Sequence, residues 1–331
     1  MSNFIRGLAA AALMLVCGAG AAASPAKTLE VIVFPGGFNW PIWVAQEKGF
    51  FSDNGVAVNL TPTPSSSFQL TGLIDGKFDI AMTAIDNLIA YREGQGEVDK
   101  KGEDLIAVMG ADRGFLKLVT VPEVPDYEAL RGKTLSVDAR NTGYALVLFE
   151  LLDRAGLREP DFKIERAGGV MQRYADLMEK KHAGTMLISP FEVQAVEKGY
   201  HVLATASETF GAYQGLVAGV RQSWAKEHGE ALQGYIRAYV LGVEWLYDPN
   251  NKDEALAIFR KYLPKLPEGA AATAYGILLE PKTGMQRKAA IDMAGVEQVL
   301  KLRSKWGVPQ MELNDPSKYY DSSYYDKALA Q

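Results

Sequence analysis

The segment from Val31 to Leu60 constrains the fold of this chain more than any other stretch. It begins with an apolar and mostly β-branched run, Val31–Phe34, which is typical of a buried strand. A Pro-Gly-Gly triplet ends that run, and Pro41 can begin a helix because the first helical position needs no N–H donor. Gly49 suits the end of this helix, and a second strand is expected over Val56–Leu60. The segment therefore predicts a strand–loop–helix–strand unit.

The loop of this unit carries Phe38, Asn39 and Trp40 at the carboxyl end of the first strand. Ligands of open α/β sheets bind at that edge, so these three side chains are candidate ligand contacts. Phe38 can stack on a solute or cap the core, and Asn39 can bind the solute or serve as a turn residue. We assign Trp40 to the ligand, because Trp43 on the following helix is the better core candidate.

Residues 1–23 have the pattern of a cleaved secretory signal peptide. Arg6 is followed by an apolar core, Leu8–Val16, and by the small residues Ala21–Ala23 before the expected cleavage site. Cleavage would remove Cys17, the single cysteine of the chain; attachment of a lipid to it is the weaker alternative, since a valine precedes it. We therefore expect a periplasmic protein without disulfides, held together by its core.

Strand-like and helix-like segments alternate along the rest of the chain, which predicts an α/β fold with parallel sheets and helices on both faces. The pattern occurs twice and divides the chain into two lobes. Lobe 1 is expected over residues 24–112 and 213–331, and lobe 2 over 113–212. Extended crossings at Ala111–Phe115 and Ala212–Gly215 would join the lobes as a hinge, with a cleft between them.

The composition argues against several classes of function. The formal net charge is −5 and there is no basic run, which disfavours nucleic acid and anionic membranes as partners. The three histidines lie in no metal-ligand spacing, and the chain has no nucleophile-elbow motif. We therefore expect no catalytic residue, no metal site and no cofactor.

Three segments resemble the periplasmic solute-binding proteins of ABC importers. They are Trp43–Phe51, Leu73–Ala81 and Leu130–Leu135, and their order and spacing are similar to those of the nitrate/sulfonate/taurine and thiamine-pyrimidine-precursor group, which includes the NMT1/THI5-like family. This resemblance implies a type II venus-flytrap fold with two hinge crossings. It also implies capture of a small solute and its delivery to ABC permease subunits and their ATPase. The alternatives are a THI5-like pyrimidine-synthesis enzyme, although this chain lacks the cysteine-rich motif of those enzymes, and a solute-sensing partner of a signalling receptor.

A cleft between the lobes would be built from six loops at strand ends. These are Gly37–Trp40, Pro64–Phe68 and Thr83–Asn87 in lobe 1, and Ala139–Tyr144, Gly168–Arg173 and Ser189–Glu192 in lobe 2. Two of these loops lead into helices with polar first turns, Ser65–Ser67 and Asn141–Gly143. Their hydroxyl and N–H groups can bind an anion, and helix capping is the alternative.

Asp86 and Glu192 are the sharper candidates, because each follows a strand at the cleft edge and each comes from a different lobe. Together they could bind an amine, an amidine or an aminopyrimidine; the alternative is an acid favoured by a helix dipole. Arg173 would bind a ligand carboxylate or pair with Asp176. The predicted ligand-binding set is Phe38, Asn39, Trp40, Ser66, Ser67, Phe68, Asp86, Asn87, Asn141, Thr142, Tyr144, Arg173 and Glu192. The expected solute is sulfonate- or taurine-like, an aminopyrimidine or a related heterocycle.

Overall fold

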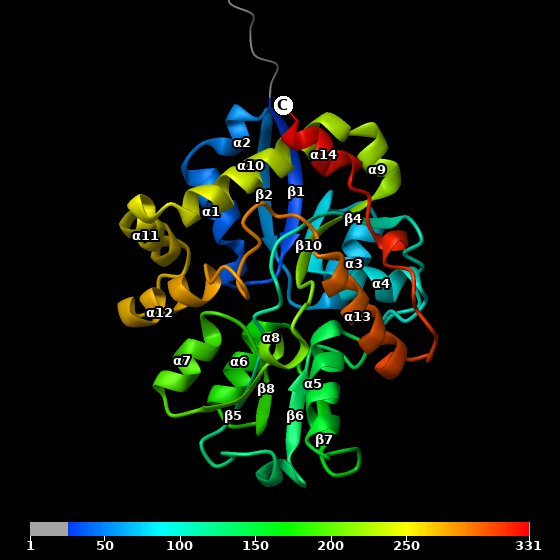
Figure 1. Ribbon diagram of the computed structural model, residues 1–331, viewed down its shortest axis with the longest axis vertical. Coiled ribbons are helices and arrows are strands. Elements are labelled where there is room, and N and C mark those ends of the chain that lie inside the picture. Colours follow the sequence, from blue (N-terminus) through cyan, green and yellow to red (C-terminus); the bar gives the residue numbers. More distant parts are fainter. Residues whose placement is uncertain (1–25, 331) are drawn as a thin grey trace, which may run out of the picture.

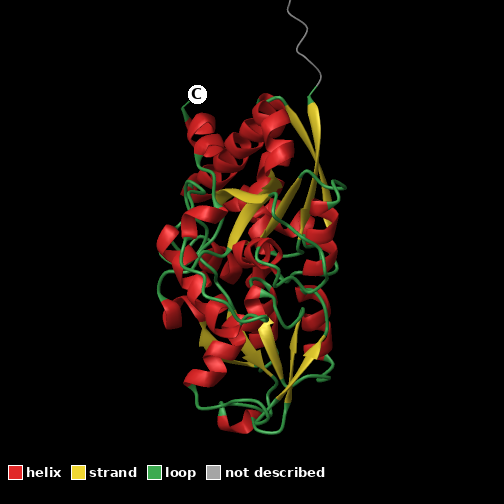
Figure 2. Cartoon of the chain, turned by 90° about the vertical axis from the view of Figure 1, so that its right-hand side faces the viewer, coloured by secondary structure: helices red, strands yellow, loops and turns green. Residues whose placement is uncertain are grey.

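The computed structural model describes residues 26–330, so the expected signal peptide lies outside the described residues. Two lobes lie one above the other along the long axis of the molecule, each built around its own sheet and flanked by helices (Figures 1 and 2). Within the described part of the chain, no helix is both long enough and apolar enough to cross a membrane.

The sheet of lobe 1 has five strands in the order β2-β1-β3-β10-β4. The strands are β1 (Lys27–Val33), β2 (Val56–Pro62), β3 (Ile80–Ala84), β4 (Leu105–Gly110) and β10 (Leu216–Arg221). β1 pairs in parallel with β2 and β3, whereas β10 runs antiparallel to both of its neighbours. The first strand–helix–strand unit of the sequence analysis is therefore confirmed.

The sheet of lobe 2 has the order β7-β6-β8-β5-β9. The strands are β5 (Lys117–Thr120), β6 (Thr134–Val137), β7 (Lys163–Arg166), β8 (Gly184–Leu187) and β9 (His201–Thr205). Both sheets are mixed, so the prediction of parallel sheets is wrong for β5 and β10, each of which is antiparallel to its neighbours. Each of these two strands enters its sheet directly from the other lobe. A helical crossover within one sheet, which forces parallel pairing, is absent at these two positions.

The helices of lobe 1 come from both ends of the chain. They are α1 (Trp40–Glu47), α2 (Phe50–Asp53), α3 (Ser66–Ile74), α4 (Ile85–Arg92), α9 (Gln222–Glu227), α10 (Gly229–Tyr247), α11 (Lys252–Tyr262), α12 (Glu268–Leu278), α13 (Met293–Trp306) and α14 (Ser323–Leu329). α10 packs on α1 and α14 packs on α10, so the C-terminal helices return to lobe 1 as predicted. Short 3₁₀ helices lie at Gly37–Asn39, Glu128–Leu130, Pro249–Asn251 and Pro316–Tyr319.

Lobe 2 is smaller and carries α5 (Gly143–Arg154), α6 (Val170–Met178), α7 (Phe191–Glu197) and α8 (Ala206–Phe210). Two helices of lobe 1 reach it: α13 packs against α5, and α12 packs against α7 (Figure 1). The two lobes therefore also touch through these helices, on both sides of the space between the sheets.

A buried carboxylate joins the two crossings. Asp112 lies in the first crossing and is 2% exposed. Its Oδ1 accepts the N–H of Gly114 at 2.8 Å, and its Oδ2 accepts the N–H of Leu216, just beyond the second crossing, at 3.3 Å. Burial raises the pKa of Asp112 to about 6. The ionised carboxyl group is thus held by two backbone donors in a place that disfavours its charge.

We expect the Asp112 carboxyl group to make folding pH-dependent in an unusual direction. Its pKa is higher in the folded protein than in the unfolded chain, so between about pH 4 and pH 6 the folded state binds a proton that the unfolded state releases. Its contribution to the free energy of unfolding therefore falls as the pH rises through this window, by up to about 3 kcal/mol.

Asp112→Asn removes this titration. Urea unfolding at a series of pH values measures the effect. The unfolding free energy of the variant minus that of the wild type should increase from pH 4 to pH 7. A difference that stays constant across this range would contradict the burial of an ionisable carboxyl group at the hinge.

Candidate functional site

A narrow cavity lies between the two lobes at the carboxyl ends of β1, β3, β6 and β8. It is lined by Phe34, Phe38, Ala84, Asn87 and Leu216 of lobe 1 and by Asp138, Thr142, Gly143, Tyr144, Val170, Arg173 and Ile188 of lobe 2. Phe34, Asp138 and Ile188 each directly follow a strand. The sheet edges therefore place the cavity where the sequence analysis expected the cleft.

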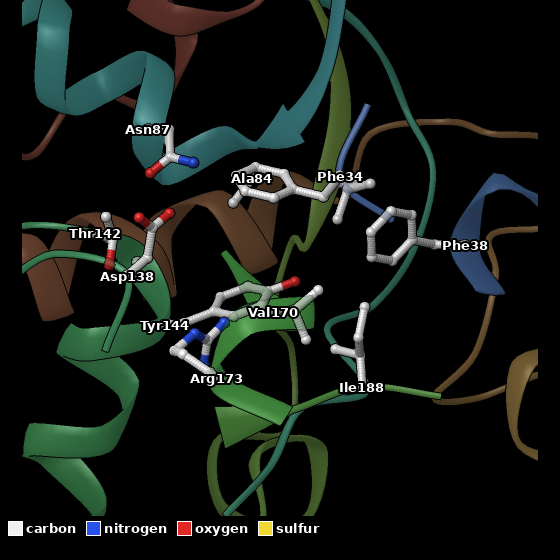
Figure 3. Close-up of a pocket in the computed structure, with 12 residues that line it drawn as sticks. Phe34, Phe38, Ala84, Asn87, Asp138, Thr142, Tyr144, Val170, Arg173 and Ile188 are labelled. Carbon is white, nitrogen blue, oxygen red and sulfur yellow. The ribbon is translucent and has the colours of Figure 1, made fainter. Parts of the chain in front are cut away.

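The cavity has an apolar end and a polar end (Figure 3). Phe38 and Ile188 lie together at one end, the ring of Phe34 extends toward the middle, and Asn87 and Asp138 face each other at the other end. This division suits a small organic molecule with an apolar body and a polar head group.

Asp138 is the polar residue that the sequence analysis missed. The expected loop began at Ala139, one residue too late, whereas Asp138 directly follows β6. Its side chain is 5% exposed, and its Oδ2 accepts the N–H of Ser66 from the other lobe at 2.8 Å. Its Oδ1 is buried and accepts no hydrogen bond from any residue of the described range 26–330.

Arg173 lines the cavity as predicted, with 2% of the residue exposed. Its Nη1 donates to Thr185 Oγ1 at 3.0 Å and to the carbonyl of Met186 at 2.6 Å, and its Nε donates to the carbonyl of Gly168 at 3.1 Å. Burial lowers the pKa of Arg173, while the nearby Asp138 opposes this effect. The guanidinium group is therefore fixed by lobe 2 itself, and the alternative pairing with Asp176 is wrong.

Four further predicted residues line the cavity: Phe38, Asn87, Thr142 and Tyr144. Thr142 Oγ1 donates to the carbonyl of Ala139 at 2.8 Å, which holds the start of α5. Burial raises the pKa of Tyr144, so its phenol stays protonated and neutral at any ordinary pH. Their contact with a solute remains a prediction.

Trp40 is a core residue, and its predicted role in stacking on a ligand is wrong. It is 0% exposed, its Nε1 donates to the carbonyl of Ala255 at 3.1 Å, and its ring lies 4.4 Å from that of Phe259. The preceding loop tightens into the 3₁₀ turn Gly37–Asn39, which directs Trp40 toward α11 and α12. Asn39 also lies outside the cavity lining, because its Nδ2 donates to the carbonyl of Phe34 at 2.6 Å, as the turn alternative predicted.

Trp40→Ala should therefore act on stability and not on recognition. Removing a fully buried indole leaves a cavity against Phe259, and we expect a loss of roughly 3–5 kcal/mol in the free energy of unfolding. Urea unfolding of the solute-free protein measures this loss. A stable variant with weakened solute binding would contradict the assignment of Trp40 to the core.

Neither of the two predicted ligand acids lines the cavity. Asp86 is 1% exposed and forms a bidentate ion pair with Arg303 of α13. The distance from Arg303 Nε to Asp86 Oδ1 is 2.7 Å, and that from Nη2 to Oδ2 is 2.5 Å. Glu192 is also buried, accepts the hydroxyl of Ser189 at 2.5 Å and lies 3.6 Å from Lys117 Nζ. Burial raises the pKa of Glu192, and Lys117 opposes this effect. Asp86 is paired on both oxygens, whereas Glu192 Oε2 is buried and has no hydrogen-bond partner within residues 26–330. Because neither acid lines the cavity, the structure does not support their contact with a solute, which stays a prediction.

No sequence pattern predicts that Arg303 is buried, because an arginine near the end of a helix is usually exposed to solvent. Here it is fully buried, and besides Asp86 it binds Gln95 Oε1 at 3.0 Å and the carbonyl of Asn141 in lobe 2 at 2.5 Å. Asn141 in turn exchanges two hydrogen bonds with the backbone of Val308, at 2.6 and 3.0 Å. Asn141 therefore joins the lobes and does not line the cavity.

The serine-rich start of α3 also serves contact between the lobes. Ser65 Oγ caps the helix by accepting the N–H of Phe68 at 3.2 Å, as the capping alternative predicted. Ser66 gives its N–H to Asp138, and Ser67 Oγ accepts from Arg166 of lobe 2 at 3.2 Å. Phe68 is 48% exposed and packs near Phe78, outside the cavity lining.

Two backbone hydrogen bonds show that the lobes are closed in this structure. The N–H of Gly37 donates to the carbonyl of Ser189, and the N–H of Gly169 donates to the carbonyl of Pro64, each at 2.9 Å. A Cβ on either glycine would lie 2.8 Å from the carbonyl oxygen that it faces. These two positions therefore need glycine for the lobes to come this close.

The sequence matches the model of the NMT1-like family over residues 22–260. The chain belongs to this family. A Bacillus subtilis (strain 168) protein, YtlA, described as a binding protein, is 26% identical over 226 residues, which cover 67% of this chain and 66% of YtlA. The matched region thus spans slightly less than two thirds of that relative.

Solved structures share the fold of this NMT1-like chain. The periplasmic nitrate-binding protein NrtA from Synechocystis PCC 6803 has a TM-score of 0.76 at 15% identity, covering 92% of this chain and 89% of NrtA. The alkanesulfonate-binding protein SsuA from Xanthomonas axonopodis pv. citri has a TM-score of 0.69 at 13% identity, covering 92% and 99%. The desulfurization enzyme DszB is also similar, with a TM-score of 0.63 at 13% identity, covering 92% and 99%. These likenesses show the periplasmic-binding-protein fold.

Proposed function

We propose that this protein is the extracytoplasmic solute receptor of an ABC importer. It would be exported by the signal peptide expected in residues 1–23 and would bind a small organic solute between its lobes in the periplasm. The candidate solutes are a sulfonate- or taurine-like compound, an aminopyrimidine or a related heterocycle. The closed protein would then deliver the solute to membrane permease subunits and their ATPase. Membership of the NMT1-like family and the fold of NrtA and SsuA support this proposal.

The observation that carries the proposal is the division of the cavity lining between the lobes. Phe34, Phe38 and Asn87 belong to lobe 1, whereas Asp138 and Arg173 belong to lobe 2. Neither lobe forms the site alone, so a bound solute would make its full set of contacts only in the closed state. A solute with this preference shifts the population toward closure.

A solute-converting enzyme is the second candidate, because DszB has the same fold. The two functions differ in what happens to the bound solute. A receptor returns it unchanged after prolonged incubation, whereas an enzyme converts it to a product that mass spectrometry detects. A third possibility, a solute-sensing partner of a signalling receptor, uses the same closure and differs only in the membrane protein that it contacts.

A thermal-shift panel tests the proposed binding function. The panel contains nitrate, taurine, isethionate, benzoate, benzamidine and 4-aminopyrimidine. A probe present at about 100 times its dissociation constant adds roughly 2.7 kcal/mol to stability, which raises the melting temperature measurably. Absence of any shift across this panel would count against a receptor for solutes of these chemistries.

Gly169→Ala should impair closure without disturbing either lobe. The new Cβ would meet the carbonyl oxygen of Pro64 only when the lobes are closed. Gly169 has a φ of −63°, which alanine adopts without strain. We expect affinity for the tightest probe of the panel to fall by about tenfold or more, equivalent to about 1.4 kcal/mol, with little change in the melting temperature of the solute-free protein.

Gly269→Ala is the matched control, because its new Cβ would meet nothing within 4 Å. Calorimetric titration of both variants with the same probe separates closure from folding. Equal affinity of the two variants would contradict the requirement for the closed form seen here.

A further inference from the structure

We propose that the solute carries a nitrogen head group that donates hydrogen bonds, as in an ammonium, an amidinium or the amino group of a heterocycle, and that Asp138 recognises it. This inference rests on the proposed function and names the chemistry of its ligand. It replaces the acids expected from the sequence, Asp86 and Glu192, by one carboxylate that has a free oxygen on the cavity.

The first observation is the unmatched oxygen of Asp138. Oδ2 is satisfied by the N–H of Ser66, but Oδ1 is buried and has no donor within residues 26–330. A buried carboxylate oxygen without a donor is costly, and a bound N–H group removes that cost. An oxygen of this kind on the wall of a cavity selects for a donor.

The second observation is the amide of Asn87, which faces the Asp138 carboxylate from the other lobe (Figure 3). Asn87 Nδ2 donates to Thr83 Oγ1 at 3.1 Å, which orients the amide and leaves its carbonyl oxygen as an acceptor. Two acceptors that face each other across a cavity need a donor with at least two hydrogens between them. Ammonium, amidinium and aromatic amino groups meet this condition, and nitrate and sulfonate do not.

The third observation concerns the place where a simple anion would be expected to bind. The amino end of α3 attracts negative charge, and the sequence analysis left open either a ligand anion or simple helix capping there. In the structure, Asp138 of lobe 2 occupies this position through its bond to Ser66. An anion at the same end of the cavity would lie beside a carboxylate and be repelled by it.

Arg173 completes the charge pattern of the cavity. Arg173 is buried close enough to Asp138 for their charges to attract each other. Its Nε and Nη1 donate hydrogen bonds to residues of lobe 2. The two charges offset each other, so the cavity does not require a solute of high net charge. A cationic head at Asp138 leaves room for a neutral ring or for an acidic tail, as in a zwitterion.

Asp138 also links recognition to closure. The same carboxylate accepts a donor from lobe 1 on one oxygen and offers the other to the solute. The apolar body of the solute then points toward Phe34 and Phe38, which belong to lobe 1 (Figure 3). Binding at Asp138 therefore holds both lobes around a single molecule.

The test uses pairs of probes that differ in the nitrogen group. Taurine and isethionate share a sulfonate and differ in ammonium against hydroxyl. Benzamidine and benzoate share a ring and differ in amidinium against carboxylate. By calorimetric titration we expect the nitrogen member of at least one pair to bind about tenfold or more tightly than its partner.

Two variants assign this preference to the residues. Asp138→Asn should reduce the affinity for the preferred nitrogen probe by about tenfold or more and should remove its advantage over the partner probe. Asn87→Ala, on the opposite lobe, should weaken the same probe while leaving the melting temperature of the solute-free protein unchanged. Asp253→Asn changes an exposed carboxylate on α11 and serves as the charge-matched control that should bind like wild type.

The outcomes separate the inference from the proposed function. Binding of isethionate at least as tightly as taurine, together with binding of benzoate at least as tightly as benzamidine, would overturn the inference and leave a receptor for anions. Undiminished affinity of Asp138→Asn for the preferred nitrogen probe would also overturn it. Binding of none of the nitrogen probes would refute the inference, whereas the receptor proposal would fail only if nitrate, isethionate and benzoate also failed to bind.

Discussion

The contact between the Asp138 carboxylate and the amino end of α3 is the interaction on which the closed structure depends. It joins lobe 2 to lobe 1 at 2.8 Å beside the cavity, at a helix end whose dipole favours a negative charge. Because only one of its two oxygens is used, the same group remains able to bind a donor from a solute. Under our proposal, closure and recognition therefore depend on one side chain.

Asp138 is distinguished among the buried carboxylates by its place on the cavity wall, since Glu192 Oε2 also has no hydrogen-bond partner within residues 26–330 but Glu192 does not line the cavity. Asp86 is matched by Arg303 on both oxygens, and Asp112 is held by two backbone N–H groups at the hinge. Burial of such groups is costly unless they are paired, and each has its partners within the fold. Asp138 differs because one of its oxygens opens onto a cavity. An acid near a cleft is a candidate for binding only if the protein leaves it unsatisfied.

Much of the fold could be predicted because local patterns decide it. β2 begins at Val56 as expected and extends two residues beyond Leu60, and β4 and β6 match runs of apolar and β-branched residues. Gly49 takes the left-handed conformation expected at the end of a helix. The antiparallel pairing of β5 and β10 could not be predicted, since it follows from chain crossings between lobes. The side-chain roles were harder still. Trp40 and Trp43 are both buried, and only the packing of α11 and α12, more than 200 residues away, decides that neither faces the cavity.

The chemistry expected of the site was closer to the structure than the residues chosen for it. A carboxylate was expected at the cleft, and Asp138 lines the cavity there, whereas Asp86 is paired with Arg303 from a distant helix. Five of the thirteen predicted residues do line the cavity: Phe38, Asn87, Thr142, Tyr144 and Arg173. Their position could be predicted because strand ends define a sheet edge from the sequence alone, whereas pairing between distant side chains cannot be read from it.

The distance between the two lobes in solution tests the central claim most directly. The only cysteine lies in the expected signal peptide, so spin labels can be placed on the mature protein through Phe68→Cys on α3 and Met171→Cys on α6, both at positions that are 48% exposed. Without solute we expect a long and broad distribution of label distances. Saturation with the tightest-binding nitrogen probe should shorten it to one narrow population in the wild-type background, and Asp138→Asn should prevent this change at the same probe concentration. An identical distribution with and without a bound probe would contradict the account of a receptor that closes around its solute.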